Sequence, residues 1–285
     1  MSVTTMSLTL LQLVTCSSLS SLQLSPGQCW GYESDCDWRP QLDTVTCEPG
    51  VRGWDGTPDP RETFYKQADF GYIRGKLSTI KHYCSISDMS PESSELKCSD
   101  NMEFCSAKNV MIDFTKMTER VRTENMKYKM DIFGTGDIQL QQCKLDKKLL
   151  QDNLEFMSPL QSWSPELQHV TVSDNTYHQC DVTIEKPVVI MKLDASVNMY
   201  HHFCDFFNLY LSLHINNSLS NYDDTTWNTD KQILLLENIP TAKKSPFAVA
   251  FSSFSSNSLM DLTNVAGKKV CFKNVVFPLL SRYIN

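Results

Sequence analysis

The sequence predicts an α/β protein built on an open, largely parallel sheet. Three apolar runs carry this prediction, at Val188–Met191, Lys231–Leu236 and Val270–Phe277. Short continuous runs of aliphatic and β-branched residues are typical of strands buried on both faces of a parallel sheet. The first run leads through LDA into a long helical pattern, so strand, turn and helix form half of a βαβ unit.

Length and composition indicate a globular protein. The chain has 285 residues, 41% of them hydrophobic and 21% charged, which is enough for one large domain or two modest ones. Its net charge of -7 and the lack of a basic stripe interleaved with aromatic residues argue against a nucleic-acid partner. No run approaches the length of a transmembrane helix, so no membrane span is expected.

The amino-terminal part is expected to contain two short regions before the α/β body. The run MSLTLLQLVTCSSLSS predicts a signal peptide over residues 1–21, although no Lys or Arg precedes it, and a disordered start is the alternative. Residues 22–62 are rich in Cys, Trp, Gly, Pro and Asp, which predicts a disulfide-rich cap of loops. Residues 63–285 then form the α/β lobe.

The eleven cysteines favour an oxidising compartment, because their spacings form no repeated CxxC metal knuckles. Cleavage of the signal peptide removes Cys16 and leaves ten cysteines available for disulfides. Asn216 begins the sequon Asn216-Asn217-Ser218, a candidate glycosylation site consistent with a lumenal location.

The remaining elements are predicted from local patterns. Apolar residues spaced by three and four predict a helix over Thr63–Tyr83, the polar stretch Ser85–Ser99 predicts a loop, and Val110–Phe114 predicts a strand. Charges of mixed sign over Lys116–Lys129 predict a solvated helix or loop without a binding role. Residues 143–169 read as helical or irregular, and the Ser-rich residues 244–262 give no clear pattern.

The helix predicted over Asn198–Ser212 separates its polar and apolar residues. On a wheel of about 100° per residue, the polar arc comprises Asn198, His201, His202, Asp205, Asn208 and Ser212. The aromatic residues lie opposite, so we expect them to pack on the sheet while the polar arc faces water or a cleft. Asp194, directly before this helix, is the expected cap of its free amides. Cys204 lies on the apolar side and is expected to be buried or disulfide-bonded.

His201, His202 and Asp205 are the candidate catalytic residues. His201 and Asp205 are four positions apart, so the carboxylate could fix the imidazole tautomer and raise its basicity. Such a base could take the proton of a Ser or Thr hydroxyl as its oxygen attacks a sugar's anomeric carbon. A structural His/Asp pair is the alternative. Adjacent histidines diverge on a helix, so no metal site is expected.

Several segments resemble the EGF-domain-specific O-GlcNAc transferase family. They occur in the family's order: CWGYESDC, FYKQADFGYIRGKL, SPLQSWSPELQ, CDVTIEKPVVIMKLDASVNMYHHFCDFFNLY and VCFKNVVFPLLSR. The resemblance implies a glycosyltransferase of family sixty-one with a two-lobed GT-B fold in the endoplasmic-reticulum lumen. It also implies transfer of GlcNAc from UDP-GlcNAc, a donor substrate rather than a cofactor, to Ser or Thr of EGF repeats such as those of Notch receptors.

The chain departs from the family's pattern towards its carboxyl end. The family's second Rossmann-like lobe, which supplies most of the nucleotide site, and its KDEL-like retrieval signal have no counterpart before the final SRYIN. Of the family's acidic Asp-x-Asp-like segment only Asp261 is present. The leading hypothesis is therefore a truncated form of the transferase, with its own activity in question. A non-catalytic, cysteine-rich lumenal protein that binds EGF-like partners is the alternative, and a metal-dependent hydrolase built on His201, His202 and Asp205 is the third.

Overall fold

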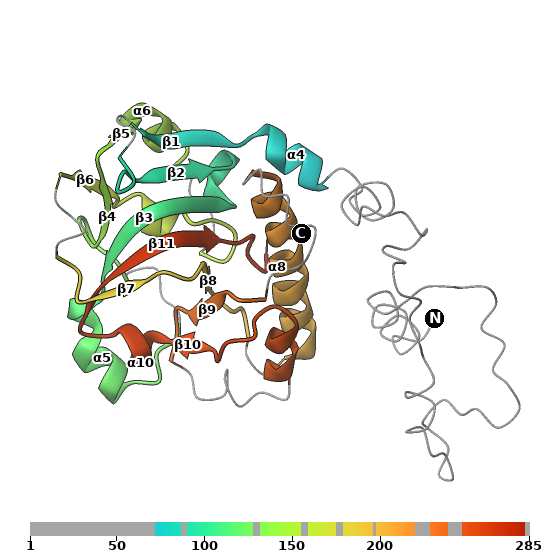
Figure 1. Ribbon diagram of the computed structural model, residues 1–285. Helices are drawn as coiled ribbons and strands as arrows, with labels where there is room; N and C mark the ends of the chain where they lie inside the picture. Colours follow the sequence, from blue (N-terminus) through green and yellow to red (C-terminus); the bar gives the residue numbers. More distant parts are fainter. Residues whose placement is uncertain are drawn as a thin grey trace, which may run out of the picture. The chain divides into compact units, whose positions relative to one another are not determined.

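The computed structural model describes residues 72–86, 90–127, 132–154, 159–174, 179–195, 198–219, 229–238 and 247–282. The predicted signal peptide and the cysteine-rich region lie outside the described residues, and so do residues 63–71 of the first predicted helix. The domain boundaries at residues 21 and 62 therefore stay predictions. The described part is α/β, as the sequence predicts (Figure 1).

One mixed sheet of eleven strands organises the described part. Its main path has the order β10-β9-β8-β11-β3-β2-β1-β5, which Figure 1 shows from β10 below to β1 above. The path comprises β1 Lys81–Ile86, β2 Glu95–Cys98, β3 Cys105–Asp113, β5 Cys143–Leu145, β8 Val188–Met191, β9 Gln232–Leu235, β10 Met260–Asp261 and β11 Lys269–Phe277. Off this path, β4 Ile138–Gln141 pairs with β3 and β6 Thr171–Ser173, and β7 Val182–Ile184 pairs with β11.

Half of the sheet is parallel and half is antiparallel. Strands β7 and β8 are parallel to β11, and β9 and β10 continue this parallel half. On its other side, β11 pairs antiparallel with β3 from Lys269 to Phe277, and β2, β1 and β5 follow in antiparallel order. The prediction of an open parallel sheet is therefore right for one half only.

The three apolar runs are confirmed as β8, β9 and β11. All four residues of β8 are buried, because β9 and β11 flank the strand and both faces of this half are covered. The predicted strand Val110–Phe114 is also confirmed, although β3 begins earlier, at Cys105.

Strands β1 and β2 correct the prediction for the region before β3. Lys81 to Tyr83 were predicted to end a helix, but the helix α4, Tyr72–Ser78, ends earlier and β1 follows. The predicted loop Ser85–Ser99 contains β2, in which Leu96 and Cys98 are buried while their neighbours face outward. Cross-strand pairing and the Cys98–Cys105 disulfide stabilise this extended chain despite its polar composition.

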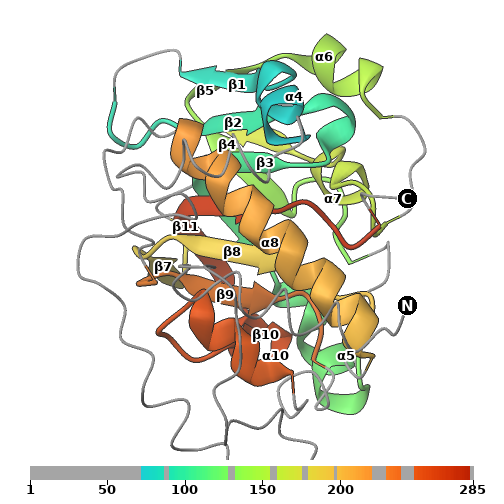
Figure 2. The same cartoon turned by 90° about the vertical axis from the view of Figure 1, so that its right-hand side faces the viewer.

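Helices cover the sheet and its edges. They are α4, α5 Thr118–Thr123, α6 Lys147–Asp152, α7 Ser164–Leu167, α8 Met199–Leu219 and α10 Leu262–Val265, with short 3-10 turns η1 Asp100–Met102, η2 Thr115–Met117 and η4 Ala248–Ser253. Figure 2 shows α8, the longest, crossing one face of the sheet. Among the helices that can be described, none combines the length and the apolar character needed to cross a membrane.

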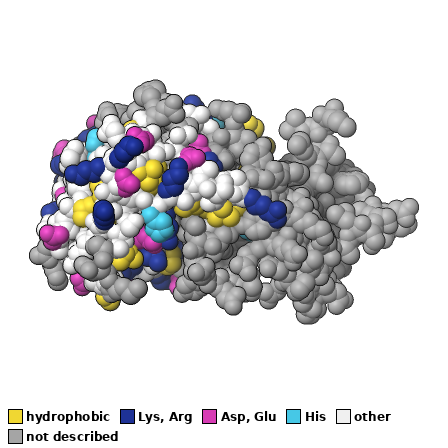
Figure 3. Space-filling model, turned by 90° about the horizontal axis from the view of Figure 1, so that it is seen from above, with side chains coloured by type: hydrophobic (Ala, Val, Ile, Leu, Met, Phe, Trp, Pro, Cys, Tyr) yellow, Lys and Arg dark blue, Asp and Glu magenta, His cyan; other side chains and the backbone are white. Residues whose placement is uncertain are grey.

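Charged side chains of both signs are interspersed on the face next to β1 and β2 (Figure 3). Lys81 Nζ lies 3.0 Å from Asp100 Oδ1, and Lys97 Nζ lies 3.0 Å from Glu95 Oε1. The Lys81–Asp100 pair is exposed, and exposed pairs contribute little to stability, typically about 0–1 kcal/mol each. This face is therefore a solvated surface.

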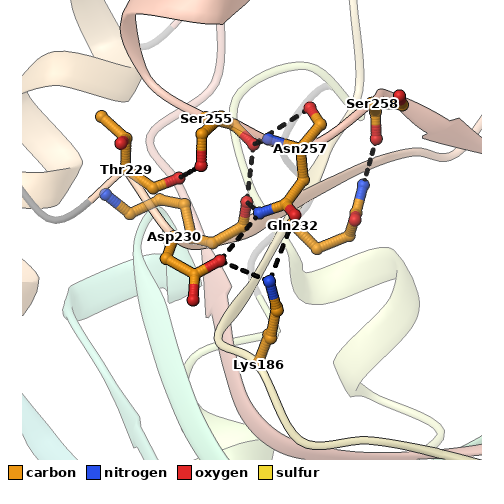
Figure 4. Close-up of polar contacts among 9 residues, drawn as sticks. Lys186, Thr229, Asp230, Gln232, Ser255, Asn257 and Ser258 are labelled. Atoms are coloured by element: carbon orange, nitrogen blue, oxygen red, sulfur yellow. Dashed lines mark hydrogen bonds and ion pairs between the residues drawn. The ribbon is translucent and has the colours of Figure 1, made fainter.

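A cluster of polar side chains forms hydrogen bonds at the amino ends of β8 and β9 (Figure 4). Lys186, before β8, donates to Asp230 Oδ1 at 2.5 Å and to Asn257 Oδ1 at 3.2 Å. Asn257 also donates to the Lys231 carbonyl at 3.0 Å, and Ser255 donates to the same carbonyl at 2.6 Å. The Ser-rich stretch that gave no clear pattern thus ends in a turn held against the start of β9. The cluster lies at the sheet edge opposite the strands' carboxyl ends.

Gly267 occupies a position that requires glycine. Its φ is +78°, and a Cβ there would lie 2.8 Å from Thr118 Oγ1. We expect Gly267→Ala to lower the free energy of unfolding by about 1–3 kcal/mol, from the left-handed backbone and the steric clash together. Gly75→Ala is the matched control, because a methyl group on Gly75 of α4 would lie within 4 Å of no atom outside its chain neighbours and the backbone of its own helix. Urea unfolding curves compare the two, and equal stability of both variants contradicts this account.

Candidate functional site at the carboxyl ends of the parallel strands

Helix α8 begins later than the position of Asp194 suggests. Asn198 caps it: its Oδ1 accepts the Tyr200 N–H at 3.0 Å, and its carbonyl accepts the His202 N–H at 3.1 Å. The prediction that Asp194 caps this helix is therefore wrong, because Asn198 stands directly before the first turn.

The two faces of α8 are reversed relative to the prediction in its first turns, whereas Leu211, predicted on the apolar face, is buried as expected. His202 is fully buried, and Asp205, Asn208 and Ser212 are at most 3% exposed. Met199, Tyr200, Phe203 and Phe207 are exposed, Tyr200 to 72%. The expectation that the polar arc faces water or a cleft is therefore wrong for these residues.

The reversal follows from hydrogen bonds between α8 and the segment after β11. Ser212 Oγ accepts the Leu279 N–H at 2.8 Å, and Asn208 Nδ2 donates to the Leu280 carbonyl at 2.6 Å. This buried segment lies beyond the last strand, so its backbone groups need side-chain partners. The polar residues of α8 are those partners, which explains why a polar arc faces inward.

His202 lies among aromatic rings. Its imidazole stacks on Phe206 at 5.5 Å between ring centroids, with Phe247 at 5.5 Å and Phe251 at 6.5 Å. Together with its complete burial, this environment indicates that His202 packs α8 against η4.

His201 pairs with Asp194. Its Nδ1 lies 2.5 Å from Asp194 Oδ2, and the other oxygen of Asp194 lies 3.2 Å from Arg282 Nη2. The His201 side chain is 33% exposed, whereas that of Asp194 is 10% exposed. The prediction that Asp205 is the partner of His201 is therefore wrong. The pair joins the end of β8 to the first turn of α8.

Two further carboxyl groups lie beside this pair. Burial, then the nearby Glu237 and Asp194, raises the pKa of Asp205 to about 8. Burial likewise raises the pKa of Glu237 to about 7, although its hydrogen bond from the Leu193 N–H counteracts the shift. Because β8 and β9 are parallel, the residues that follow them meet at one edge of the sheet, where open α/β folds bind ligands.

Lys192 and Glu166 form a buried ion pair at the same edge. Lys192 Nζ lies 3.0 and 3.1 Å from the two Glu166 carboxylate oxygens and 4.2 Å from the centroid of the Trp163 ring. Burial lowers the pKa of Lys192 and raises that of Glu166 to about 6, although each charge partly stabilises the other. The pair fixes the end of β8 against α7.

The ranges that the structure describes contain no group of three or more His, Cys, Asp or Glu side chains placed to hold a metal ion. Asp261 caps α10 by accepting the Thr263 N–H at 2.9 Å. This residue thus has a local structural role here.

The described cysteines are mostly oxidised. Disulfides join Cys84 to Cys143, Cys98 to Cys105 and Cys180 to Cys271. Cys204 has a free thiol and is half-buried, so the expectation of a buried or disulfide-bonded cysteine is not met in this part of the chain. Burial raises its pKa, which disfavours the nucleophilic thiolate. Asn216 lies near the end of α8 and is half-buried, and its glycosylation stays a prediction.

Sequence reasoning missed several residues of this edge. They are Lys192, Glu166, Glu237 and Arg282, none of which belongs to the helical wheel of α8. A signal was present for two of them, because Lys192 directly follows the apolar run of β8 and Glu237 follows that of β9. Charged residues directly after buried parallel strands are expected at the ligand-binding edge.

Comparison with known proteins identifies the relatives of this chain. No protein-family model matches it. The EGF domain-specific O-linked N-acetylglucosamine transferase of Drosophila melanogaster is 42% identical over 261 residues, which is 90% of this chain and 48% of the relative. The enzymes of that name from Rattus norvegicus and Gallus gallus are both 37% identical, over 90% and 89% of this chain and 47% and 45% of their own lengths.

The similarity extends along nearly the whole of this chain, but the chain spans about half the length of these curated relatives. The identities of 42% and 37% come from an insect, a mammal and a bird, and all three relatives carry the same name. The chain is thus a homologue of the EGF domain-specific O-linked N-acetylglucosamine transferases.

Proposed function

We propose that this chain forms one lobe of a GT-B-type transferase that moves GlcNAc from UDP-GlcNAc to Ser or Thr of EGF repeats. The similarity to transferases of this specificity over nine-tenths of the chain is the observation that carries the proposal. The mixed α/β architecture, with charged residues at the carboxyl ends of parallel strands, is compatible with such a lobe. EGF-repeat proteins, Notch receptors among them, are the proposed acceptors.

His201 is the proposed general base. Its Nδ1 faces Asp194, so the neutral imidazole carries its proton there and keeps a lone pair on Nε2. Nε2 takes the proton of the acceptor hydroxyl while the hydroxyl oxygen forms a bond to the anomeric carbon. The bond from that carbon to UDP breaks, and UDP leaves with the electron pair. His202 and Asp205, proposed with His201 from the sequence, are buried, so they are proposed to support the position of the base rather than to touch the substrate.

The secretory pathway is the proposed location, and within it the endoplasmic-reticulum lumen. Three disulfides among the described residues indicate an oxidising compartment. The homologous transferases act on EGF domains according to their name, and EGF domains are themselves disulfide-rich secreted modules.

A non-catalytic role is the second candidate. The chain spans about half the length of its relatives, and transfer needs the sugar nucleotide's leaving diphosphate to be stabilised as well as the acceptor to be held. A lobe that binds EGF-like partners without transferring sugar fits the same similarity.

The test incubates the purified chain with a folded EGF repeat and UDP-GlcNAc and detects an added N-acetylhexosamine by mass spectrometry. His201→Ala is expected to lower transfer by about 10²–10⁴-fold, the usual contribution of a general base. His82→Ala is the matched control, because the His82 side chain is also accessible to solvent and lies 3.4 Å from a carboxylate, that of Glu95, on the antiparallel half of the sheet.

Three results bear on the two candidates. Undiminished transfer by His201→Ala contradicts the role of His201 as base. Absence of transfer by the unmodified chain, with EGF binding retained in a pull-down, favours the non-catalytic candidate. Absence of both transfer and binding contradicts the two candidates together.

A further inference from the structure

The turn Lys192-Leu193-Asp194 is held by three buried acids from three different elements. We call these residues the strand-end turn, because they directly follow β8. Glu166 of α7 binds the Lys192 ammonium, Glu237 after β9 accepts the Leu193 N–H at 2.8 Å, and the Asp205 carboxyl of α8 faces the Asp194 N–H, which lowers its pKa. Each residue of the turn thus has its own carboxyl partner.

The backbone of the strand-end turn lies beyond the ladder of hydrogen bonds that joins β8 to β9. The hydrogen bond from the Leu236 N–H to the Met191 carbonyl, at 2.9 Å, lies at the end of the parallel ladder between β8 and β9. Leu193 and Asp194 are nevertheless buried, with exposed fractions of 1% and 8%. A buried N–H without an acceptor costs about 1–3 kcal/mol, so the two carboxyl groups replace the missing strand partners.

Burying the carboxyl groups of Asp205 and Glu237 costs free energy whenever they are ionised. Asp205 is 3% exposed and Glu237 is 2% exposed, and the raised pKa of each records the free energy needed to ionise it there. Asp205 Oδ2 meets no hydrogen-bond partner among the residues that the structure describes. An apolar side chain would fill the same space without this cost, so the acceptors must provide more than packing.

What they provide is the orientation of Asp194. Its two carboxylate oxygens point to His201 Nδ1 and to Arg282 Nη2, at 2.5 and 3.2 Å. A side chain as short as aspartate moves with its backbone, so a rotation of the strand-end turn would take the carboxylate off the imidazole. The tautomer of a histidine is set by the hydrogen bond that one of its nitrogens makes. The backbone of the turn therefore determines which nitrogen of His201 stays unprotonated.

We propose that Asp205 and Glu237 are positioning residues that hold the Asp194 carboxylate on His201 Nδ1 through the backbone N–H groups of Asp194 and Leu193. The sequence pattern suggests that Asp205 acts on His201 directly, and the structure assigns it an indirect role instead. The catalytic meaning of this arrangement rests on the proposed function. The arrangement itself is a property of the folded chain and is tested without any substrate.

The test reads the tautomer of His201 by long-range proton–nitrogen NMR correlation on the full chain at a pH where the imidazole is neutral. His201→Asn assigns the signals, and Asp194→Ala is the reference in which the Nδ1–H form is lost. Asp205→Leu and Glu237→Leu remove the acceptors, so we expect the Nδ1–H form to give way to Nε2–H. Asp205→Asn and Glu237→Gln keep a carbonyl acceptor, so we expect them to retain the Nδ1–H form.

Asp137→Leu is the matched control for a merely structural effect. Asp137 is also a buried aspartate, 4% exposed, and accepts a backbone N–H, that of Gly134, at 2.7 Å. We expect this variant to lose stability and to keep the Nδ1–H tautomer. Alanine variants at positions 205 and 237 are made as well. They also lack the acceptor, so they replace a leucine variant that does not fold.

Two results overturn the proposal. One is an unchanged tautomer in folded Asp205 and Glu237 variants that lack an acceptor, and the other is an equal loss in Asp137→Leu. Because the NMR signal needs no sugar transfer, a chain that fails the transferase assay but shows the expected tautomer changes refutes the proposed activity and keeps the positioning role. A chain that transfers sugar but shows unchanged tautomers refutes the positioning role and keeps the proposed activity.

Discussion

The chain is expected to lose stability steeply as the pH rises from about 4 to about 9. Asp205 has its pKa raised in the fold to about 8 from an ordinary value of 3.8. A carboxyl group whose folded pKa exceeds its unfolded pKa binds its proton more tightly in the folded state. Its contribution is therefore fully present below the unfolded value and is lost as the pH rises through about 8.

The loss has a predictable size. Each unit of pKa difference corresponds to about 1.4 kcal/mol, so Asp205 alone accounts for a loss on the order of 5 kcal/mol. Glu237, with its pKa raised to about 7, acts in the same direction and at a lower pH. Domains of ordinary size have about 5–15 kcal/mol of stability, so this loss is a large share of the total.

Burial sets the sign of the pKa shift of Asp205, and the neighbouring acids add to it. Asp194 after β8 and Glu237 after β9 both face it and both disfavour its ionised form, whereas the Asp194 N–H favours it. Among the described residues, Lys127 lowers the pKa of Glu237, and Arg282 pairs with Asp194. Burial remains the largest cause of the shift.

Urea unfolding at a series of pH values measures this prediction. The unmodified chain should show a falling free energy of unfolding between about pH 5 and 9. Asp205→Asn should reduce this slope, because an amide does not titrate, and the contribution of Glu237 should remain. Asp137→Asn, a buried aspartate on the other half of the sheet, should keep the slope. An unchanged slope in Asp205→Asn would show that other groups bind these protons.

The elements that sequence alone predicts well are those whose stability is local or whose pattern is unambiguous. Strands β8 and β9 are continuous apolar runs and could be placed within one residue at each end. The long helical pattern of α8 placed its start, although the helix continues seven residues beyond the predicted end at Ser212, to Leu219. Strands β1 and β2 could not, because their polar residues extend only through pairing with each other and with β3. No local pattern reports a cross-strand partner that lies elsewhere in the sequence.

The orientation of α8 is the clearest case in which a correct pattern gave a wrong conclusion. The wheel separated polar from apolar residues correctly, but polarity does not say whether water or protein satisfies a side chain. Asn208 and Ser212 face inward because the segment after β11 needs their hydrogen bonds. For the same reason the i,i+4 rule paired His201 with Asp205, whereas the partner is Asp194 from the end of a strand.

Removing the Cys180–Cys271 disulfide is expected to cost far more stability than removing Cys98–Cys105. The first bond closes a loop with a sequence separation of 91, and the second closes one of only 7. By the chain-entropy relation these loops correspond to about 4.6 and about 2.5 kcal/mol. Because Cys271 lies in β11, at the centre of the sheet, the longer bond also ties β7 to the strand that joins both halves.

Paired alanine replacements test this expectation, since each pair removes one bond without leaving an unpaired thiol. Urea unfolding of Cys180→Ala/Cys271→Ala should show the larger loss, and Cys98→Ala/Cys105→Ala serves as the matched control within the same sheet. The two bonds act on different parts of the sheet. The Cys180–Cys271 bond restrains the parallel half that carries Asp194 and Glu237, and the Cys98–Cys105 bond restrains a hairpin of the antiparallel half. Equal losses would mean that native packing around the sulfurs, rather than restriction of the unfolded chain, sets the contribution of these bonds.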